Sequence, residues 1–217
     1  MNMHKKLAEF FATVCYIGKI KYAPGTFGSL PAFPLCYIIM HFTLNNQIVF
    51  HIEGFAIAEQ QIITLIIIEL FATLLLFILG TYATNIYIQG SEDQDPKEVV
   101  IDEVVGQMLV IILGSLSVIL AFGTTLPEHF DAEIIDFVFL FLFPFILFRL
   151  FDILKPWPIN WLDENIKGAF GVMLDDVAAA IFAVIVHYVI IFFILDGGLK
   201  LQMRHIKIYD IKINNLL

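Results

Sequence analysis

Residues Ile62–Ile88 read IITLIIIELFATLLLFILGTYATNIYI, a stretch in which Glu69 is the only Asp, Glu, Lys or Arg. A helix needs about 20 predominantly apolar residues to cross the hydrocarbon core of a bilayer, and this stretch is long enough. We therefore predict a membrane-spanning helix here. Three later segments have the same character, and a shorter one with two prolines precedes it: Val104–Phe122, Ile134–Phe151, Val177–Leu195 and Ser29–Leu44.

The composition of the whole chain supports this interpretation. Of the 217 residues, 59% are hydrophobic and only 15% are charged, and the mean hydropathy is +0.87. An average soluble domain is about 45–50% apolar and about 25% charged. An ordinary soluble enzyme and a disordered chain are therefore both excluded. We expect one domain over residues 1–217 with an all-α fold, a polytopic integral membrane helical bundle of four to five transmembrane helices.

The charges indicate an orientation in the membrane. The net charge is −9 and no basic face is apparent, which excludes a nucleic-acid partner. Residues 45–59 and 123–133 contain no Lys or Arg, so with five spans and a cytoplasmic N-terminus these loops would face outward. Three polar segments, 16–28, 89–103 and 149–176, would then share the cytoplasmic side. The basic tail around Lys200–Lys212 argues against this orientation, because it would lie outside.

Acidic residues recur at the mouths of three predicted spans. Each could be a helix cap or a solvated charge. However, charges that enter a bilayer are costly and usually mark a functional site. Carboxylates gathered on one membrane side would also repel one another unless a cation lay between them. Because the ligands would all be oxygens, we predict bound Mg²⁺. The residues concerned are Asp102, Glu103, Asp152, Asp175 and Asp176.

Cationic residues accompany these acids. Arg149 lies three residues before Asp152 and shares its helix face, and Pro156 predicts that this helix ends near Lys155. Arg149 and Lys155 suit an anionic substrate. Residues 23–30, APGTFGSL, form a tight turn in this interpretation, and Gly25, Thr26 and Gly28 could help to hold a phosphate. Carboxylates, Mg²⁺ and cations together are typical of phosphoryl transfer.

Four motifs occur in order along the chain: APGTFGSL at 23–30, VIDEVVG at 100–106, FRLFDILKPWPI at 148–159 and GVMLDDV at 171–177. In these motifs the sequence resembles the phosphatidylglycerophosphatase A family, over about residues 18–183. The resemblance implies a Mg²⁺-dependent lipid phosphatase in the bacterial inner (cytoplasmic) membrane, with its active site facing the cytoplasm. Its substrate would be phosphatidylglycerophosphate, hydrolysed at the terminal phosphomonoester to phosphatidylglycerol, and its other partners would be membrane lipids.

The resulting assignment gives each motif a role. The five carboxylates hold Mg²⁺, and one of them acts either as general base or as covalent nucleophile. Arg149 and Lys155 bind the substrate phosphates, completed by Gly25, Thr26 and Gly28. Two alternatives stay open. One is a lipid headgroup enzyme like the CDP-alcohol phosphotransferases. The other is a membrane transporter, since Glu69 and His187 lie within predicted spans.

Overall fold

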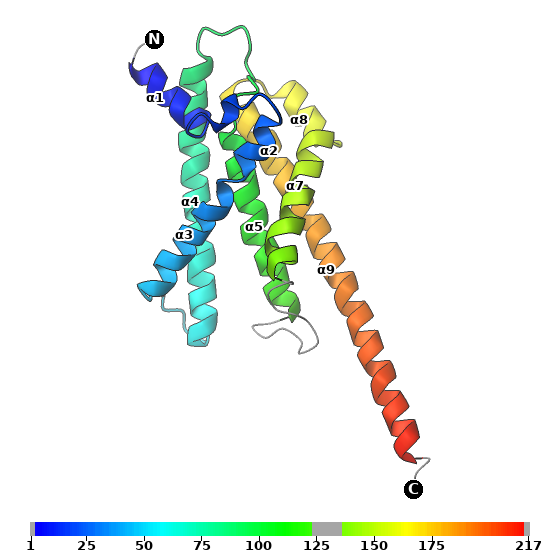
Figure 1. Ribbon diagram of the computed structural model, residues 1–217. Helices are drawn as coiled ribbons and strands as arrows, with labels where there is room; N and C mark the ends of the chain where they lie inside the picture. The colour runs from blue at the N-terminus through cyan, green and yellow to red at the C-terminus, as the bar shows by residue number, and fades with distance from the viewer. Residues whose placement is uncertain (1–2, 123–135, 215–217) are drawn as a thin grey trace.

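The computed structural model describes residues 3–122 and 136–214, and this part of the chain is helical without a strand (Figure 1). Four helical stretches are long and apolar enough to cross a membrane: Pro24–Asn45, Ile57–Ile88, Ile101–Ile119 and Ala169–Phe193. The predicted helical membrane bundle is therefore confirmed. The elements are α1 (Met3–Ala12), η1 (Ile17–Lys19), α2 (Pro24–Ser29), α3 (Ala32–Asn45), α4 (Ile57–Ile88), α5 (Ile101–Phe122), η2 (Asp136–Leu142), α7 (Phe143–Leu154), α8 (Ile159–Asn165) and α9 (Ala169–Asn214).

The candidate spans match the predicted segments with one exception. The predictions at Ile62–Ile88, Val104–Phe122 and Val177–Leu195 fall within or largely over candidate spans, and the shorter Ser29–Leu44 segment lies in the span that α2 and α3 form together. The predicted span at Ile134–Phe151 starts outside the described residues. Its described part forms the π-helical η2 and then α7, and it is not among the four. The predicted outward loop at 123–133 also lies outside the described residues.

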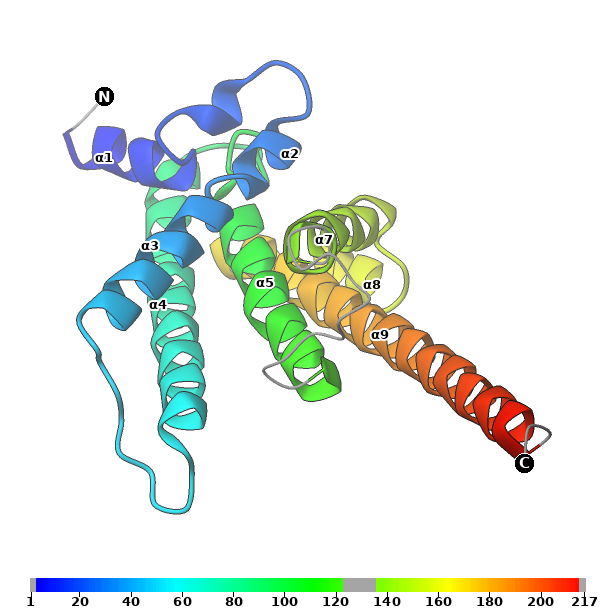
Figure 2. The same cartoon turned by 60° about the horizontal axis from the view of Figure 1, so that its bottom comes forward.

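Helix α5 is the central helix of the bundle. In its candidate span 67% of the residues are buried within the protein, against 17% for α4, which lies at the periphery (Figure 2). One apolar cluster joins Met108 and Ile112 of α5 to α4 and α9. A second cluster joins Val110 of α5 to Phe148 of α7 and Ala180 of α9. Burial on both sides fixes α5 relative to α7 and α9, the helices that carry most of the polar motifs.

A glycine sets how closely these helices approach. A Cβ at Gly106 of α5 would lie 2.5 Å from Phe148 Cε2 and 3.2 Å from the carbonyl oxygen of Asp176. Because real Cβ atoms do not approach other atoms so closely, only glycine permits this contact between α5, α7 and α9. The close approach occurs one turn along α5 from Asp102 and Glu103.

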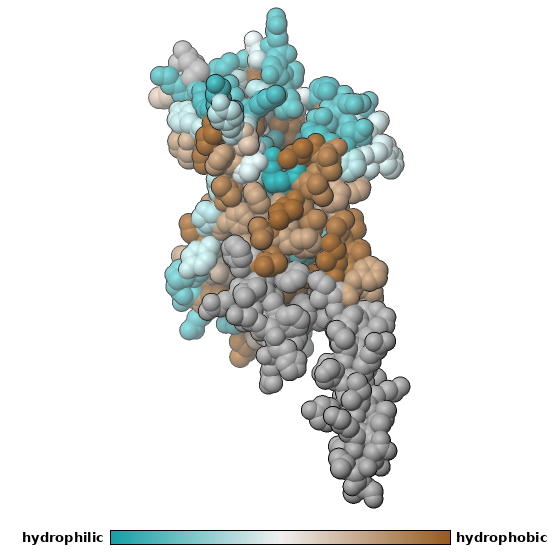
Figure 3. Space-filling view, turned by 45° about the vertical axis from the view of Figure 1, so that its right-hand side comes forward, coloured by the Kyte–Doolittle hydropathy of each residue, from teal (hydrophilic) through white to brown (hydrophobic). Residues whose placement is uncertain are grey.

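The polar parts of the chain gather at one end of the bundle. Helices α1, α2 and α8 and the α4–α5 connection lie at the upper end in Figure 1, and α9 runs from that end toward the C-terminus at the other. The face in Figure 3 has a hydrophilic region above a broad hydrophobic band. The three polar segments therefore share one end of the bundle, as predicted from the parity of the spans.

Two local predictions were wrong. Residues 23–30 do not form a simple turn, because Pro24–Ser29 is the short helix α2, which begins after Ala23 at φ 47° and in which the Ser29 hydroxyl donates to the Gly25 carbonyl at 2.8 Å. Helix α9 begins at Ala169, so Asp175 and Asp176 lie two turns inside a helix rather than before one. Gly168, at φ 80°, makes the turn into α9.

Candidate active site

Three carboxylates from two helices form the centre of the site. Asp102 and Glu103 lie in the first turn of α5, and Asp176 faces them from α9. One oxygen from each lies within 4.8 Å of the others, a spacing that could hold a metal ion. Asp102 and Asp176 are only 8% and 3% exposed. Helix packing therefore brings acids 73 or 74 positions apart in the sequence to one buried point.

The three carboxylates lack protein partners for part of their hydrogen-bonding capacity. Asp102 Oδ1, Glu103 Oε2 and Asp176 Oδ2 are buried with no hydrogen-bond partner among the described residues. A buried, unpaired carboxylate is strongly unfavourable, and three together repel one another. A divalent cation with oxygen ligands removes both penalties. The residues present therefore fit a hard divalent metal ion.

Arg149 connects three helices at the edge of this group. Its Nη1 lies 2.8 Å from Asp152 Oδ2 on the same helix, and 4.0 Å from Glu103 Oε1 on α5. The same nitrogen donates to the Ser29 hydroxyl at 3.3 Å. The side chain is only 13% exposed. The guanidinium is thus held in one orientation beside the carboxylate group, as recognition of an anionic group requires.

Lys155 directly follows α7, six residues after Arg149. It ends the helix in the left-handed region at φ 41°, close to the predicted end. Its Nζ lies 2.5 Å from Asp175 Oδ2 and 3.1 Å from Asp163 Oδ1. Partial burial disfavours the charged form of Lys155, but the hydrogen bonds and charges of Asp175 and Asp163 outweigh burial and raise its pKa. Lys155 therefore stays protonated and joins α7, α8 and α9.

The glycine-containing helix α2 lies directly against the charged groups. A Cβ at Gly25 would clash with Glu103 Oε1 and lie 2.8 Å from Arg149 Nη2, so a larger residue here would displace these two side-chain ends. A Cβ at Gly28 would instead lie 2.5 Å from the Cβ of Val100. Thr26 lines a groove together with Arg149. Of the three predicted phosphate-binding positions, only Gly25 contacts the charged groups through its backbone position.

All five predicted carboxylates and both predicted cations lie at this end of the bundle, in two different arrangements. Asp102, Glu103 and Asp176 form the group of three. Asp152 and Asp175 instead pair with Arg149 and Lys155. Asp152 is still close enough for its charge to act on each member of the group. The two ion pairs surround the three grouped oxygens.

Three further polar residues were missed by sequence reasoning. Gln107 is fully buried on α5, and neither amide atom has a hydrogen-bond partner among the described residues. Its place one helical turn after Glu103 was a usable signal. Ser29 and Asp163 contact Arg149 and Lys155 through tertiary packing alone. Their roles carried no signal in the local sequence.

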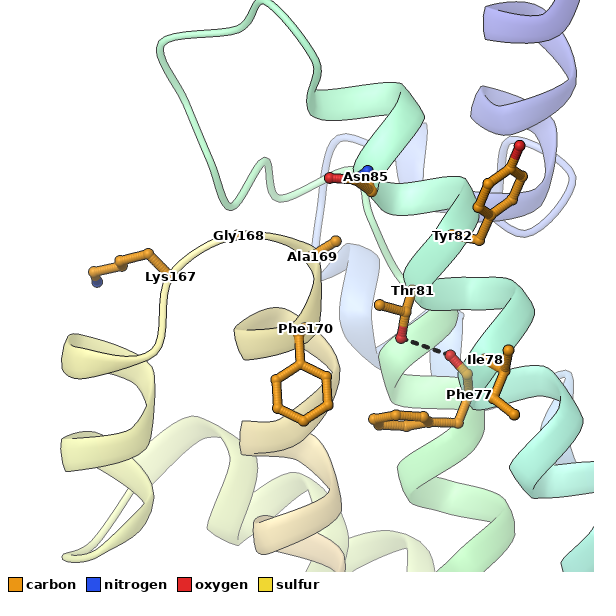
Figure 4. Close-up of a pocket in the computed structure, with 9 residues that line it drawn as sticks. All are labelled: Phe77, Ile78, Thr81, Tyr82, Asn85, Lys167, Gly168, Ala169 and Phe170. Atoms are coloured by element: carbon orange, nitrogen blue, oxygen red, sulfur yellow. Dashed lines mark hydrogen bonds between the residues drawn. The ribbon is translucent and has the colours of Figure 1, made fainter.

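A separate cavity of about 610 Å³ lies between α4 and the α8–α9 connection. In Figure 4 the rings of Phe77 and Phe170, which both line it, lie edge to face with centroids 6.0 Å apart, and the Lys167 amine points away. No member of the carboxylate group lines this cavity. It is therefore distinct from the charged site.

Comparisons with known proteins agree with the motifs. Residues 10–191 match the sequence model of the family described as phosphatidylglycerophosphatase A. A Haemophilus influenzae phosphatidylglycerophosphatase A is 33% identical over 182 residues, covering 82% of this chain and 85% of the relative. The Escherichia coli phosphatidylglycerophosphatase A is 44% identical over 46 residues, covering 21% of this chain and 27% of its own.

A third relative carries a different name. A Bacteroides thetaiotaomicron protein with the provisional name phosphatidylinositol-3-phosphatase is 29% identical over 164 residues, which is 76% of this chain and 80% of the relative. No solved structure matches the chain.

Proposed function

The chain belongs to the phosphatidylglycerophosphatase A family and is a phosphatase, and from this premise we propose that it hydrolyses phosphatidylglycerophosphate to phosphatidylglycerol. The observation that carries the proposal is the group formed by Asp102, Glu103 and Asp176, buried and without full partners beside Arg149. The two relatives named phosphatidylglycerophosphatase A support this choice of substrate. The comparisons support neither a CDP-alcohol phosphotransferase nor a transporter.

We propose Mg²⁺ as the ion, with Asp102, Glu103 and Asp176 as its ligands. Oxygen donors without a Cys or His among them favour a hard cation. When bound, Mg²⁺ supplies positive charge that stabilises the phosphoryl oxygens during transfer. The carboxylates themselves contribute the buried negative charge that such a cation needs.

The two cationic side chains bind the substrate phosphates in this proposal. Arg149 and Lys155 offer N–H donors at the margin of the carboxylate group, and Asp152 and Asp175 hold them in place. Asp152 and Asp175 therefore act as positioning residues, since Oδ2 of each already pairs with one of these cations. A preorganised donor of this kind typically contributes about 10²–10³ in rate.

The reaction itself is a displacement at phosphorus. An oxygen atom bonds to the terminal phosphorus, the bond from phosphorus to the glycerol oxygen breaks, and that glycerol oxygen takes up a proton. One carboxylate either removes the proton of an attacking water or attacks phosphorus itself, forming an acyl phosphate that water then hydrolyses. Rapid acid quenching distinguishes the two routes, because only the second yields a phosphorylated enzyme.

We also propose that the protein lies in the bacterial inner membrane with this site on the cytoplasmic side. The support is the charge of the predicted loops, in which Lys and Arg concentrate near the polar end. The substrate headgroup would then meet water at the membrane surface while its acyl chains stay among the apolar helices.

The test is phosphate release from a panel of lipids in detergent micelles. The panel contains phosphatidylglycerophosphate, phosphatidate and phosphatidylinositol 3-phosphate, assayed with Mg²⁺, with EDTA, and after Mg²⁺ is restored. We expect the highest kcat/KM for phosphatidylglycerophosphate, loss of activity in EDTA, and recovery with Mg²⁺. Preference for another lipid would overturn the substrate, and activity indifferent to chelation would overturn the metal. The variant Asp102→Asn provides the background rate.

A further inference from the structure

A second hollow in the surface lies between α2 and α7. It has a volume of about 320 Å³, and it is lined by Thr26 of α2 and by residues of α7. The α7 residues are Phe145, Ile146, Arg149, Leu150, Ile153 and Leu154. We call it the α2–α7 groove.

The spacing of its lining residues gives the groove an apolar stripe along one face of α7. Ile146, Leu150 and Ile153 recur at intervals of four and three residues, so their side chains form one stripe on α7. From Phe145 to Leu154 this stripe extends about 14 Å at the rise of an α-helix. These apolar residues are substantially exposed, with Ile146 at 50% and Leu150 at 45%. They therefore present an apolar surface that no protein element among the described residues covers.

Arg149 lies both in the α2–α7 groove and beside the carboxylate group. Its side chain lines the groove, and its Nη1 bonds Asp152 and approaches Glu103. Its Nε is buried and has no hydrogen-bond partner among the described residues. Thr26 of α2 lies on the opposite wall. An occupant would thus meet apolar side chains along most of its length and a cation where it reaches the site.

We propose that the α2–α7 groove holds an acyl chain of the lipid substrate, and that the lipid reaches the site from the bilayer between α2 and α7. The proposal rests on the proposed function and adds the binding path. Such a ligand carries an anionic group covalently attached to a long apolar chain. This chemistry matches a single buried arginine at the edge of the apolar α2–α7 groove. A partner helix would cover the same apolar stripe but would bring no anionic group to Arg149, whose Nε has no hydrogen-bond partner among the described residues.

The cavity in Figure 4 is the competing path. It is larger, but it is lined by residues of α4, of the α8–α9 connection and of the start of α9, and neither Arg149 nor a member of the carboxylate group lines it. Lys167, its cation, is bonded to the carbonyl oxygen of Asp163 at 2.9 Å. A lipid held there would have its phosphate away from the grouped acids. This difference makes the cavity a suitable matched control.

The experiment fills each hollow with a larger side chain. Ile146→Trp and Leu150→Trp narrow the α2–α7 groove, and Ile78→Trp, also at an exposed apolar position, narrows the cavity in Figure 4. Each variant is assayed with long-chain phosphatidylglycerophosphate and with a short-chain, water-soluble analogue. We expect the two groove variants to lower kcat/KM for the long-chain lipid by about tenfold, equivalent to about 1.4 kcal/mol. Their kcat/KM for the short-chain analogue and both values for Ile78→Trp should stay near wild type.

Equal losses on both substrates would overturn the proposal, because the groove variants would then disturb the charged site. A loss with Ile78→Trp and none with the groove variants would overturn it in favour of the other cavity. A second readout does not depend on turnover: a phosphatidate with a photoreactive acyl chain should label peptides of α7, and Leu150→Trp should reduce that labelling. If the wild-type protein releases no phosphate from any lipid, the proposed function fails, while labelling still decides whether the groove binds a lipid chain.

Discussion

In the proposed metal site, Asp176 serves the reaction at the expense of stability. Its carboxylate is 3% exposed, one oxygen has no partner among the described residues, and it lies near Asp102 and Glu103. Without a cation these charges repel one another in a medium that screens them poorly. Active sites commonly retain such unfavourable groups, and neutralising them then stabilises the fold while it removes activity.

We therefore predict opposite effects of Asp176→Asn on stability and activity. Activity with Mg²⁺ should fall at least about 100-fold, because a proposed metal ligand is lost. In EDTA the variant should unfold at a higher temperature than wild type, because the amide carries no charge, and Mg²⁺ should stabilise it less than wild type. Thermal unfolding in detergent and phosphate release measure the two effects. Glu92→Gln, an exposed acid on the α4–α5 connection, is the control and should change neither.

A variant that is less stable than wild type in EDTA would contradict this view. Such a result would mean that Asp176 contributes a favourable structural contact, and its carboxylate would then be no source of stored repulsion.

Arg149 carries a second residue-scale prediction. A single planar group contacts Asp152 and Ser29 and approaches Glu103, and lysine cannot reproduce that geometry although it keeps the charge. We expect Arg149→Lys to lower kcat by about 10²–10³. Lys167→Arg, a change at an exposed cation on the other cavity, should leave kcat unaltered. Near wild-type turnover of Arg149→Lys would reduce the role of Arg149 to its charge alone.

At the scale of elements, the crossing of α5, α7 and α9 sets the geometry of the site. Gly106 and Gly114 both lie on α5, but only Gly106 is tightly enclosed. A Cβ there would meet the Phe148 ring at 2.5 Å, whereas the nearest atoms to a Cβ at Gly114 lie 3.6 Å away, at ordinary contact distance. The two glycines therefore provide a matched pair on one helix.

We predict that Gly106→Ala destabilises the protein by about 1–3 kcal/mol, since the added methyl group overpacks a closed crossing. It should also lower activity, because Phe148 precedes Arg149 and the Asp176 carbonyl lies 3.2 Å from the new Cβ. Gly114→Ala should be neutral or stabilising by up to about 1 kcal/mol, the usual gain for alanine in a helix. Unfolding midpoints and phosphate release of the two variants decide the point. Equal effects of the two substitutions would show that α5 can move away from α7 and α9 at this crossing without loss of stability or activity.

The same elements mark how far sequence reasoning reaches. The apolar run after Asp102 and Glu103 placed these residues correctly at the start of a helix, because span length and charge are local properties. Helix α9 was placed too late, since the predicted span began at Val177, whereas the helix begins at Ala169 and a Cβ at Gly171 would clash with the Ile166 carbonyl oxygen. That glycine serves the packing of α8 against α9, and such a contact has no local signature.

For the whole molecule, the sequence predicted the helical bundle and the gathering of its polar segments at one end. The bundle follows from hydropathy, and the gathering follows from the parity of the spans between these segments. It did not predict which acids form the group of three and which pair with Arg149 and Lys155. That division depends on how far α5, α7 and α9 rotate about their axes, and the packing of Phe148 against Gly106 fixes this only in the folded protein. A sequence pattern therefore could not predict which acids pair with Arg149 and Lys155.

The orientation of the molecule in the membrane gives the last prediction, and a native cysteine tests it. Cys15 is exposed between α1 and η1, at the end of the bundle that carries the site, whereas Cys36 is buried in α3. If that end faces the cytoplasm, a membrane-impermeant maleimide should leave Cys15 unmodified in intact spheroplasts and modify it in inverted membrane vesicles. Cys15→Ser should abolish the labelling, since Cys36 is shielded in both preparations. Labelling in intact spheroplasts would place the site outside, and the phosphatase would then act on lipids of the outer leaflet.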